Sequence, residues 1–277
     1  MPFTLHWHTE PLLLITLLFF AWGYALCVGP WRSRFAPANM RYPTVQAVLF
    51  FSGLLIAYLT VGSPLDQLGE DFLFSAHMVQ HMLLVYALPP LFILGTPQWL
   101  VDSCLRFAVL KKIGRVVFHP VTAGFTFTFL YTVWHIPTLY ELALQEKLFH
   151  VIEHWSMFLP ALCMWWPMLS LSKILPGSNY GVRMLYVFVL MIGQLPVFGF
   201  LTLSDEILYP TYEFAPRILE LDPLQDQILG GLIMKITNMA VSLFLLCTTF
   251  YQWYCSENEQ GQSSDKKQTL ALDKAVG

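Results

Sequence analysis

Long runs of apolar residues, separated by short polar segments, dominate the hydropathy pattern of the chain. Each run has about 20 residues, the length that an α-helix needs to cross the hydrocarbon core of a bilayer. Strands of a membrane barrel would instead show short segments of alternating character. The pattern predicts an all-α integral membrane protein, a bundle of seven transmembrane helices. The predicted spans are about Pro11–Val28, Pro43–Val61, Phe72–Leu94, Val116–Ile136, Leu148–Leu169, Tyr180–Leu203 and Ile228–Tyr251.

The segments between and after these runs have their own character. Residues 97–110 are amphipathic and are expected to lie in the membrane interface. Residues 62–71 and 204–227 are predicted to be acidic loops. The polar tail is low in aromatic residues, so we expect it to be disordered. The chain is therefore divided into a seven-span transmembrane domain, 1–254, and a cytoplasmic tail, 255–277.

Composition supports a membrane protein, and the distribution of charge orients it. The chain is 56% hydrophobic and only 12% charged, whereas soluble domains carry about 25% charged residues. Basic residues gather in alternate loops and in the tail, and the opposite loops are acidic. By the positive-inside rule, the N-terminus lies outside and the C-terminus is cytoplasmic. The basic residues on the inner side are Arg32, Arg34, Arg41, Arg106, Lys111, Lys112, Arg115, Lys173, Arg183, Lys266, Lys267 and Lys274.

Two histidine pairs stand out within the spans. His77 and His81 are four residues apart, as are His150 and His154, so each pair shares one helix face. With this topology His81 and His154 lie roughly 13 and 9 Å below the outer surface, at 1.5 Å per residue. His135 ends its span on the same side. Because polar residues inside a membrane are costly and usually functional, these histidines predict a metal or haem site near the outer face.

Other candidates have simpler explanations. His119, before Pro120, is expected only to begin a helix. His6 and His8 are either disordered or a capture site for metal. Met78 and Met82 point away from the neighbouring histidines and serve packing or ligation. These three groups do not alter the prediction of a histidine site.

Three residues of the fifth and seventh spans leave other roles open. Glu153 directly precedes His154, so it is expected to face elsewhere in the span, as a surface carboxylate or a support for the site. Lys235 is expected to reach outward to the interface or to pair with Glu153 or Asp226. Met234, about six residues into its inward-running span, adds a soft sulfur ligand near the histidines.

Several motifs together resemble one known family. They comprise His77-Met78-Val79-Gln80-His81-Met82-Leu83, Pro90 through Gly95 to Pro97, His119-Pro120, Trp134-His135-Ile136-Pro137 with Leu139-Tyr140, His150-x-x-Glu153-His154 with Trp165-Trp166-Pro167, and Asp222-Pro223-Leu224-x-Asp226-Gln227-x-x-Gly230-Gly231-x-Ile233-Met234. In order and spacing they resemble the polytopic CtaG family of cytochrome c oxidase assembly factors, of the caa3-type oxidase branch. The resemblance covers about residues 70–240. One departure is Lys235, where the family would have an aromatic residue.

The resemblance implies a function. The chain would be a non-enzymatic factor of the bacterial plasma membrane that helps to mature a haem–copper oxidase, handling copper as a chaperone on the outer face. The oxidase subunits, other copper chaperones and the lipid bilayer would be its partners, and we expect no nucleic acid. The metal ligands that the resemblance implies are His77, His81, His135, His150, His154 and Met234.

Two other functions fit the same residues. The chain could be a bis-histidine haem-binding or a haem-modifying membrane protein. Bis-histidine ligation between spans is a common way to hold haem, and His81 with His154 have suitable depths. A copper or proton transporter would need a polar path to the inner face, where Gln194 and Asn238 are the main candidates. A purely structural scaffold would leave the gathering of histidines at one face unexplained.

Overall fold

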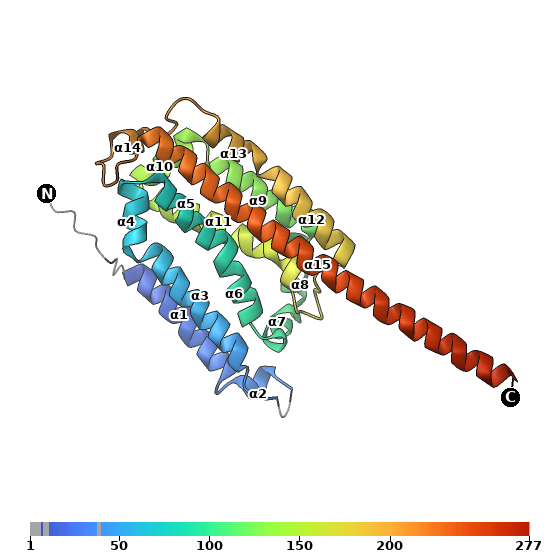
Figure 1. The fold of residues 1–277 in the computed structure, drawn as a ribbon. Helices are drawn as coiled ribbons and strands as arrows, with labels where there is room; N and C mark the ends of the chain where they lie inside the picture. Colours follow the sequence, from blue (N-terminus) through green and yellow to red (C-terminus); the bar gives the residue numbers. More distant parts are fainter. Residues whose placement is uncertain (1–6, 8–10, 38–39, 277) are drawn as a thin grey trace.

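The computed structural model describes residue 7 and residues 11–37 and 40–276, with the backbone alone from residue 260 onward (Figure 1). This part of the chain is helical and contains no β-strand. The elements are α1 (Pro11–Val28), α2 (Arg32–Phe35), α3 (Thr44–Val61), α4 (Pro64–Asp71), α5 (Phe74–Met82), the π-helical turn η1 (Leu83–Ala87), α6 (Leu88–Gly95), α7 (Gln98–Leu105), α8 (Ala108–Val117), α9 (Pro120–Trp134), α10 (Pro137–Gln145), α11 (Lys147–Leu169), α12 (Tyr180–Gly193), α13 (Leu195–Thr202), α14 (Pro210–Phe214) and α15 (Pro223–Val276).

Within the described residues, five helical stretches are long and apolar enough to cross a bilayer. The bent pair α8 and α9, with 64° between its two helices, brings this number to six. The predicted fifth span, α11, is 23 residues long but is not among them, and its first two turns carry His150, Glu153 and His154. The five stretches are Pro11–Val28, Thr44–Asp71, Phe74–Gly95, Tyr180–Thr202 and Pro223–Glu259.

Three segments differ from the sequence-based expectations. The acidic loop at 62–71 is largely helical, because the Ser63 side chain accepts a hydrogen bond from the Leu65 amide at 3.2 Å and Pro64 occupies the first turn. Both features favour a helix start. The amphipathic segment at 97–110 is split between α7 and α8. The polar tail continues α15 as a helix to Val276 rather than as a disordered segment, since it is rich in helix-forming residues and has no proline.

The main core forms where α15 crosses α5, which lie side by side in Figure 1. Gly230 of α15 permits this approach, because a Cβ atom there would lie 2.6 Å from Cε1 of Phe74 and 3.1 Å from Cγ of Met78. Phe74 and Met78 are fully buried in this core. The position of α5, and of the histidines it carries, therefore depends on contact with α15.

Asp226 fixes the start of α5 from a distant part of the chain. Its carboxylate accepts hydrogen bonds from the backbone amides of Phe74, at 2.7 Å, and Ser75, at 3.2 Å. The carboxylate is buried and faces the positive end of the helix dipole, an arrangement that stabilises a helix start. Asp226 thus acts as the N-terminal cap that α5 lacks in its own sequence.

We expect Asp226→Ala to destabilise the protein by about 1–3 kcal/mol, because two buried amides would lose their acceptor. Thermal unfolding in detergent would show this as a lower midpoint temperature. Asp205→Ala, which removes an exposed carboxylate, is the matched control and should leave the midpoint unchanged. Equal midpoints for the two variants would contradict the capping role.

A π-helical turn, η1, follows α5. The proline at 89 has no N–H, so the carbonyl of Val85, four residues earlier, cannot be bonded in the usual α-helical way. The indole N–H of Trp165 donates to this carbonyl at 2.8 Å, and the backbone N–H of Leu88 instead reaches Leu83. The hydrogen bond from Trp165 to Val85 connects the third predicted span to α11, close to the histidines.

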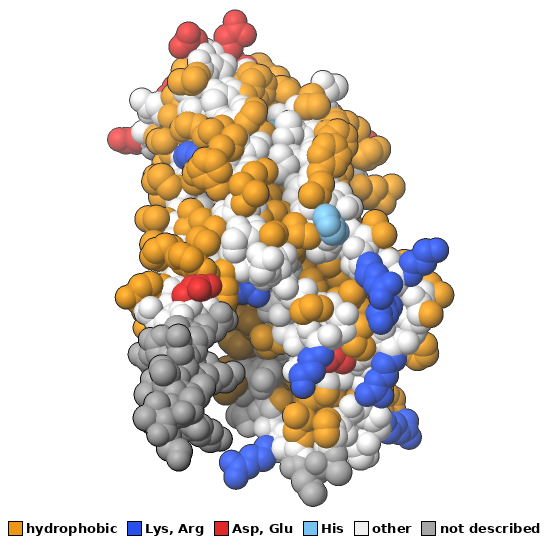
Figure 2. All heavy atoms as spheres, turned by 90° about the vertical axis from the view of Figure 1, so that its right-hand side faces the viewer, with side chains coloured by type: hydrophobic (Ala, Val, Ile, Leu, Met, Phe, Trp, Pro, Cys, Tyr) orange, Lys and Arg blue, Asp and Glu red, His pale blue; other side chains and the backbone are white. Residues whose placement is uncertain are grey.

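α1 and α3 form a second, smaller core at the edge of the bundle. The Tyr24 ring stacks on Phe50 with centroids 3.9 Å apart, and its hydroxyl donates to the carbonyl of Gly95 at 2.8 Å. The opposite face of α1 is open and apolar, with Phe19 and Trp22 more than 70% exposed. Figure 2 shows hydrophobic side chains over the middle of one face, several acidic ones at one end, and most lysine and arginine side chains toward the other, where a few acidic side chains also lie. This surface is suited to a bilayer.

Candidate metal centre

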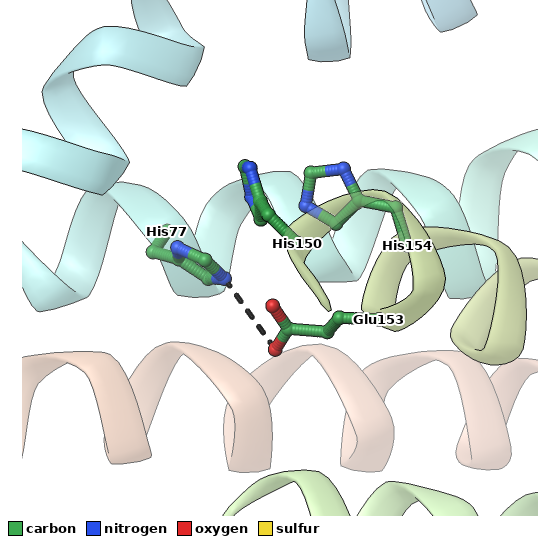
Figure 3. A group of neighbouring side chains, drawn as sticks. All are labelled: His77, His150, Glu153 and His154. Carbon is green, nitrogen blue, oxygen red and sulfur yellow. Dashed lines mark ion pairs between the residues drawn. The ribbon is translucent and has the colours of Figure 1, made fainter. Parts of the chain in front are cut away.

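Helices α5 and α11 bring four potential ligands together. His77 comes from α5, and His150, Glu153 and His154 come from α11. One ligand atom from each of the four lies within 4.8 Å of the others. Figure 3 shows the four side chains facing a common space. Tetrahedral ligands at metal–ligand bonds of about 2.1 Å are roughly 3.4 Å apart, so small side-chain movements would bring these atoms into coordination.

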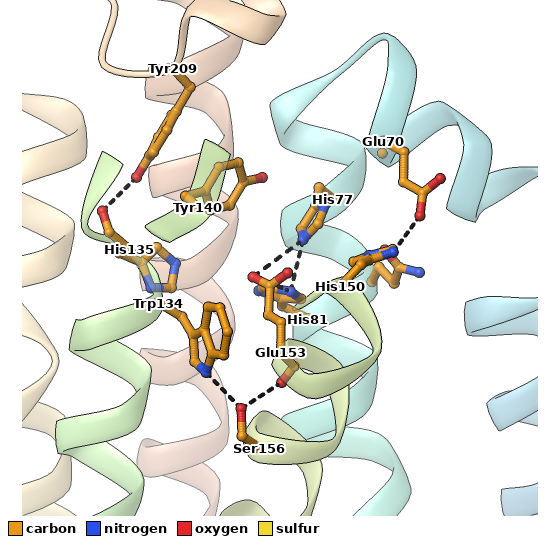
Figure 4. Close-up of polar contacts among 12 residues, drawn as sticks. Glu70, His77, His81, Trp134, His135, Tyr140, His150, Glu153, Ser156 and Tyr209 are labelled. Carbon is orange, nitrogen blue, oxygen red and sulfur yellow. Dashed lines mark hydrogen bonds and ion pairs between the residues drawn. The ribbon is translucent and has the colours of Figure 1, made fainter. Parts of the chain in front are cut away.

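His81 and His135 extend this group on the side of α9. Nε2 of His81 lies 2.8 Å from Nε2 of His77, so one of the two imidazoles donates and the other accepts. The ring centroid of His135 is 6.3 Å from that of His81, and its Nδ1 lies 2.6 Å from the carbonyl of Tyr131. This bond orients His135 with Nε2 free to face the cluster (Figure 4). All five predicted histidines therefore lie in one group.

Glu153 is the member that the sequence prediction missed. Rather than facing the surface, it is fully buried, with Oε1 3.5 Å from Nε2 of His81 and 3.8 Å from Nε2 of His77. The expectation followed from its neighbour His154, which is one residue further on and faces another direction. It is three residues after His150, a spacing that shares a helix face, and that signal was available in the sequence.

Each residue of this group has at least one buried polar atom without a hydrogen-bond partner. Among the described residues, buried side-chain atoms that lack a hydrogen bond occur on each of the five histidines and on both carboxylate oxygens of Glu153. An unsatisfied buried polar group costs about 1–3 kcal/mol, and native proteins keep few of them. The donor set of imidazole nitrogens and one carboxylate fits a metal cation, which would satisfy several of these atoms at once.

Tyrosines from the loop before α15 close the cluster on one side. The hydroxyl of Tyr212 donates to the carbonyl of Gly69 at 2.6 Å, so the Tyr140 hydroxyl donates to Tyr212 at 2.9 Å. The Tyr209 hydroxyl donates to the carbonyl of His135 at 2.9 Å (Figure 4). A Cβ atom at Gly69 would lie 2.9 Å from Cα of His77, so α4 lies directly against the histidine helix.

The remaining candidates are placed elsewhere. Met234 is buried in the apolar core with Met78, and its predicted ligand role stays a prediction. His119 begins α9 and its Nδ1 accepts a bond from Val121 N at 3.3 Å, which confirms its expected role as a helix-start residue. Nζ of Lys235 lies 5.8 Å over the ring of Phe198 rather than beside a carboxylate. His6 and His8 lie outside the described residues.

The fold and the site together define an all-helical membrane protein with a buried cluster of histidines and one carboxylate. Within that class the chain belongs to the cytochrome c oxidase caa3 assembly factor family (Caa3_CtaG), whose family model matches residues 22–256. This confirms the resemblance seen in the motifs and extends it over most of the chain. Comparison with curated proteins and with solved structures gave no significant match.

Proposed function

We propose that the protein supports the assembly of a haem–copper oxidase by holding copper as cargo in the histidine–carboxylate cluster. The observation that supports this most strongly is the gathering of five histidines and Glu153, each with a buried side-chain atom that lacks a hydrogen-bond partner. The family is one of cytochrome c oxidase assembly factors, and copper is a metal that such an oxidase needs. We propose a non-enzymatic role, with oxidase subunits and other copper chaperones as partners.

The residues that would hold the ion are His77, His150, Glu153 and His154, with His81 and His135 close enough to exchange with them. Imidazole ligands suit copper, and a carboxylate accommodates the cupric form better than the cuprous one. The Glu153 charge offsets part of the cation charge in a buried site. Having more candidate ligands than one ion requires is suited to cargo, because ligands can be exchanged one at a time.

The proposed orientation places the cluster near the outer face of the bacterial plasma membrane. We propose that α11 is a span despite its polar first turns, which makes seven spans with the N-terminus outside and the C-terminus inside. The separation of acidic and basic side chains toward opposite ends (Figure 2) supports this orientation, because basic loops stay in the cytoplasm. The acidic outer loops would also raise the local concentration of cations.

We expect His77→Ala protein to insert into the membrane but to bind less than one copper per chain and to fail to support oxidase activity. The reason is the loss of a fully buried ligand from α5. Metal analysis and an ultraviolet–visible spectrum on the same detergent-purified sample would measure this. His119→Ala, which changes a histidine that only begins α9, is the control. Normal copper binding and oxidase activity in the His77 variant would contradict the proposal.

The same spectrum tests the haem alternative. A Soret band would indicate haem, with His81 and His154 as the first candidates for axial ligands. Their ring centroids are 5.7 Å apart with an interplanar angle of 82°, and the side chains of His77 and Glu153 lie beside them. The crowding of these side chains favours a single ion over a macrocycle.

A further inference from the structure

A second group of ligands adjoins the buried cluster on α4. Asp66 and Glu70 are four residues apart on this short helix and share its face. Together with His150, each offers one ligand atom within 4.8 Å of the others. Glu70 pairs through Oε1 with Nδ1 of His150 (Figure 4). His150 is thus the residue common to both groups.

The two nitrogens of His150 serve different groups. Nδ1 faces Glu70, whereas Nε2 is buried without a hydrogen-bond partner. His150 lies within 5.7 Å of the His77 ring and 4.2 Å of the His154 ring, measured between centroids. One imidazole therefore separates the carboxylates of α4 from the buried cluster, with a ring nitrogen available on each side.

A buried glutamine gives independent support for a ligand beside these carboxylates. The amide of Gln80 donates through Nε2 to Asp66 and to the carbonyl of Thr60. Its Oε1 is buried and has no hydrogen-bond partner. Since Gln80 is fully buried, this oxygen is an unsatisfied acceptor next to Asp66. Oxygen atoms of this kind bind cations.

The two groups differ in access to solvent. The Glu70 side chain is 31% exposed, whereas those of His77 and Glu153 are fully buried. Glu70 is therefore more accessible to a hydrated cation than His77 and Glu153 are. Two carboxylates and one imidazole also form a harder ligand set than three imidazoles and one carboxylate, so the outer group should bind copper more weakly.

We propose that Asp66, Glu70 and His150 form an outer cation site that receives Cu²⁺ and passes it to the buried cluster through the shared imidazole of His150. This inference rests on the proposed function of the buried cluster. Transfer needs no change in oxidation state, since ligands on one side replace ligands on the other. Gly69 directly precedes Glu70, and a Cβ atom there would lie 2.9 Å from Cα of His77. The absence of a side chain at Gly69 keeps α4 close enough to α5 for the exchange.

The test measures Cu²⁺ binding to the full-length protein in detergent, by equilibrium titration and by the rate of loading. The wild type should bind one Cu²⁺ tightly and a second about 100-fold more weakly. In the Asp66→Asn/Glu70→Gln double variant the weak ion should be lost, the tight ion retained, and loading of the tight site slowed about 10-fold. With both sites loaded, His150 would lose its ring N–H proton to solvent and bridge the two Cu²⁺ ions as an imidazolate. Electron paramagnetic resonance should therefore show a coupled pair in the wild type and an isolated Cu²⁺ signal in the variant.

The control is Glu213→Gln/Glu220→Gln, which removes the same charge from exposed outer positions and should change the loading rate less than twofold. If the α4 variant matched this control in both stoichiometry and rate, the outer site would be refuted. Loss of the tight ion as well would also refute it, because the carboxylates would then belong to a single site. A wild type that binds no Cu²⁺ would instead refute the proposed function.

Discussion

Glu153→Gln protein is expected to bind copper about 100-fold more weakly than the wild type. The substitution keeps the size of the side chain but removes the carboxylate that, among the described residues, lies nearest the imidazoles of His77 and His81. Removing one partner of a buried charge pair typically costs about 2–5 kcal/mol, and 1.4 kcal/mol corresponds to a tenfold change in affinity. A competition titration with a copper chelator would measure the change.

In the metal-free protein, the same substitution should leave the stability of the fold unchanged or raise it. In the absence of a cation, Glu153 is a buried carboxylate without a hydrogen-bond partner, and a buried group of this kind destabilises a fold. The unfolding temperature of metal-free Glu153→Gln protein should therefore be equal to or higher than that of the wild type. A gain in stability with a loss of binding would mark Glu153 as a functional residue rather than a structural one.

Glu141→Gln provides the comparison. Glu141, on α10, is also a carboxylate, but it accepts hydrogen bonds from the backbone N–H of Thr211, at 3.2 Å, and from the Thr211 hydroxyl, at 2.7 Å. Its variant should lose stability and keep its copper affinity. If Glu153→Gln bound copper as tightly as this control, Glu153 would have no part in the site.

Gly230→Ala, at the crossing of α5 and α15, is expected to lower both the stability of the protein and its copper binding. Gly230→Ala would place a Cβ atom 2.6 Å from Phe74 Cε1, closer than packed carbon atoms can lie, so α5 would have to move. Overpacking of this kind costs about 1–3 kcal/mol, whereas alanine gains only up to about 1 kcal/mol over glycine in a helix. The protein should therefore be destabilised, and copper binding should fall because His77 and His81 move with α5.

Gly231→Ala is a matched control on the neighbouring face of α15. Its Cβ atom would meet the side chain of Thr202, at 2.7 Å from Cγ2, and would not touch α5. We expect a similar loss of thermal stability with copper affinity within about twofold of the wild type. Equal copper affinities in the two glycine variants would show that the crossing does not position the site.

The family and the gathering of the five histidines could both be predicted from motifs and spacing. The pairs His77 with His81 and His150 with His154 share helix faces because of the 3.6-residue period, and a costly polar pair inside an apolar run indicates a function. Apolar run length also located α1 at Pro11–Val28 and the helix from Thr44 to Val61. These properties depend only on residues that are near one another in the chain.

The tertiary structure decided which helix faces meet. A helical period shows that Glu153 shares a face with His150. Only the packing of α11 against η1 and α6, which continue α5, shows that this face is buried beside His77 rather than open to lipid. The cap that Asp226 gives α5 joins residues about 150 positions apart, and the placement of Met234 in the apolar core depends on the same crossing. Such contacts follow from the close approach of helices at small residues such as Gly69 and Gly230, where steric fit between distant segments, rather than local pattern, determines the arrangement.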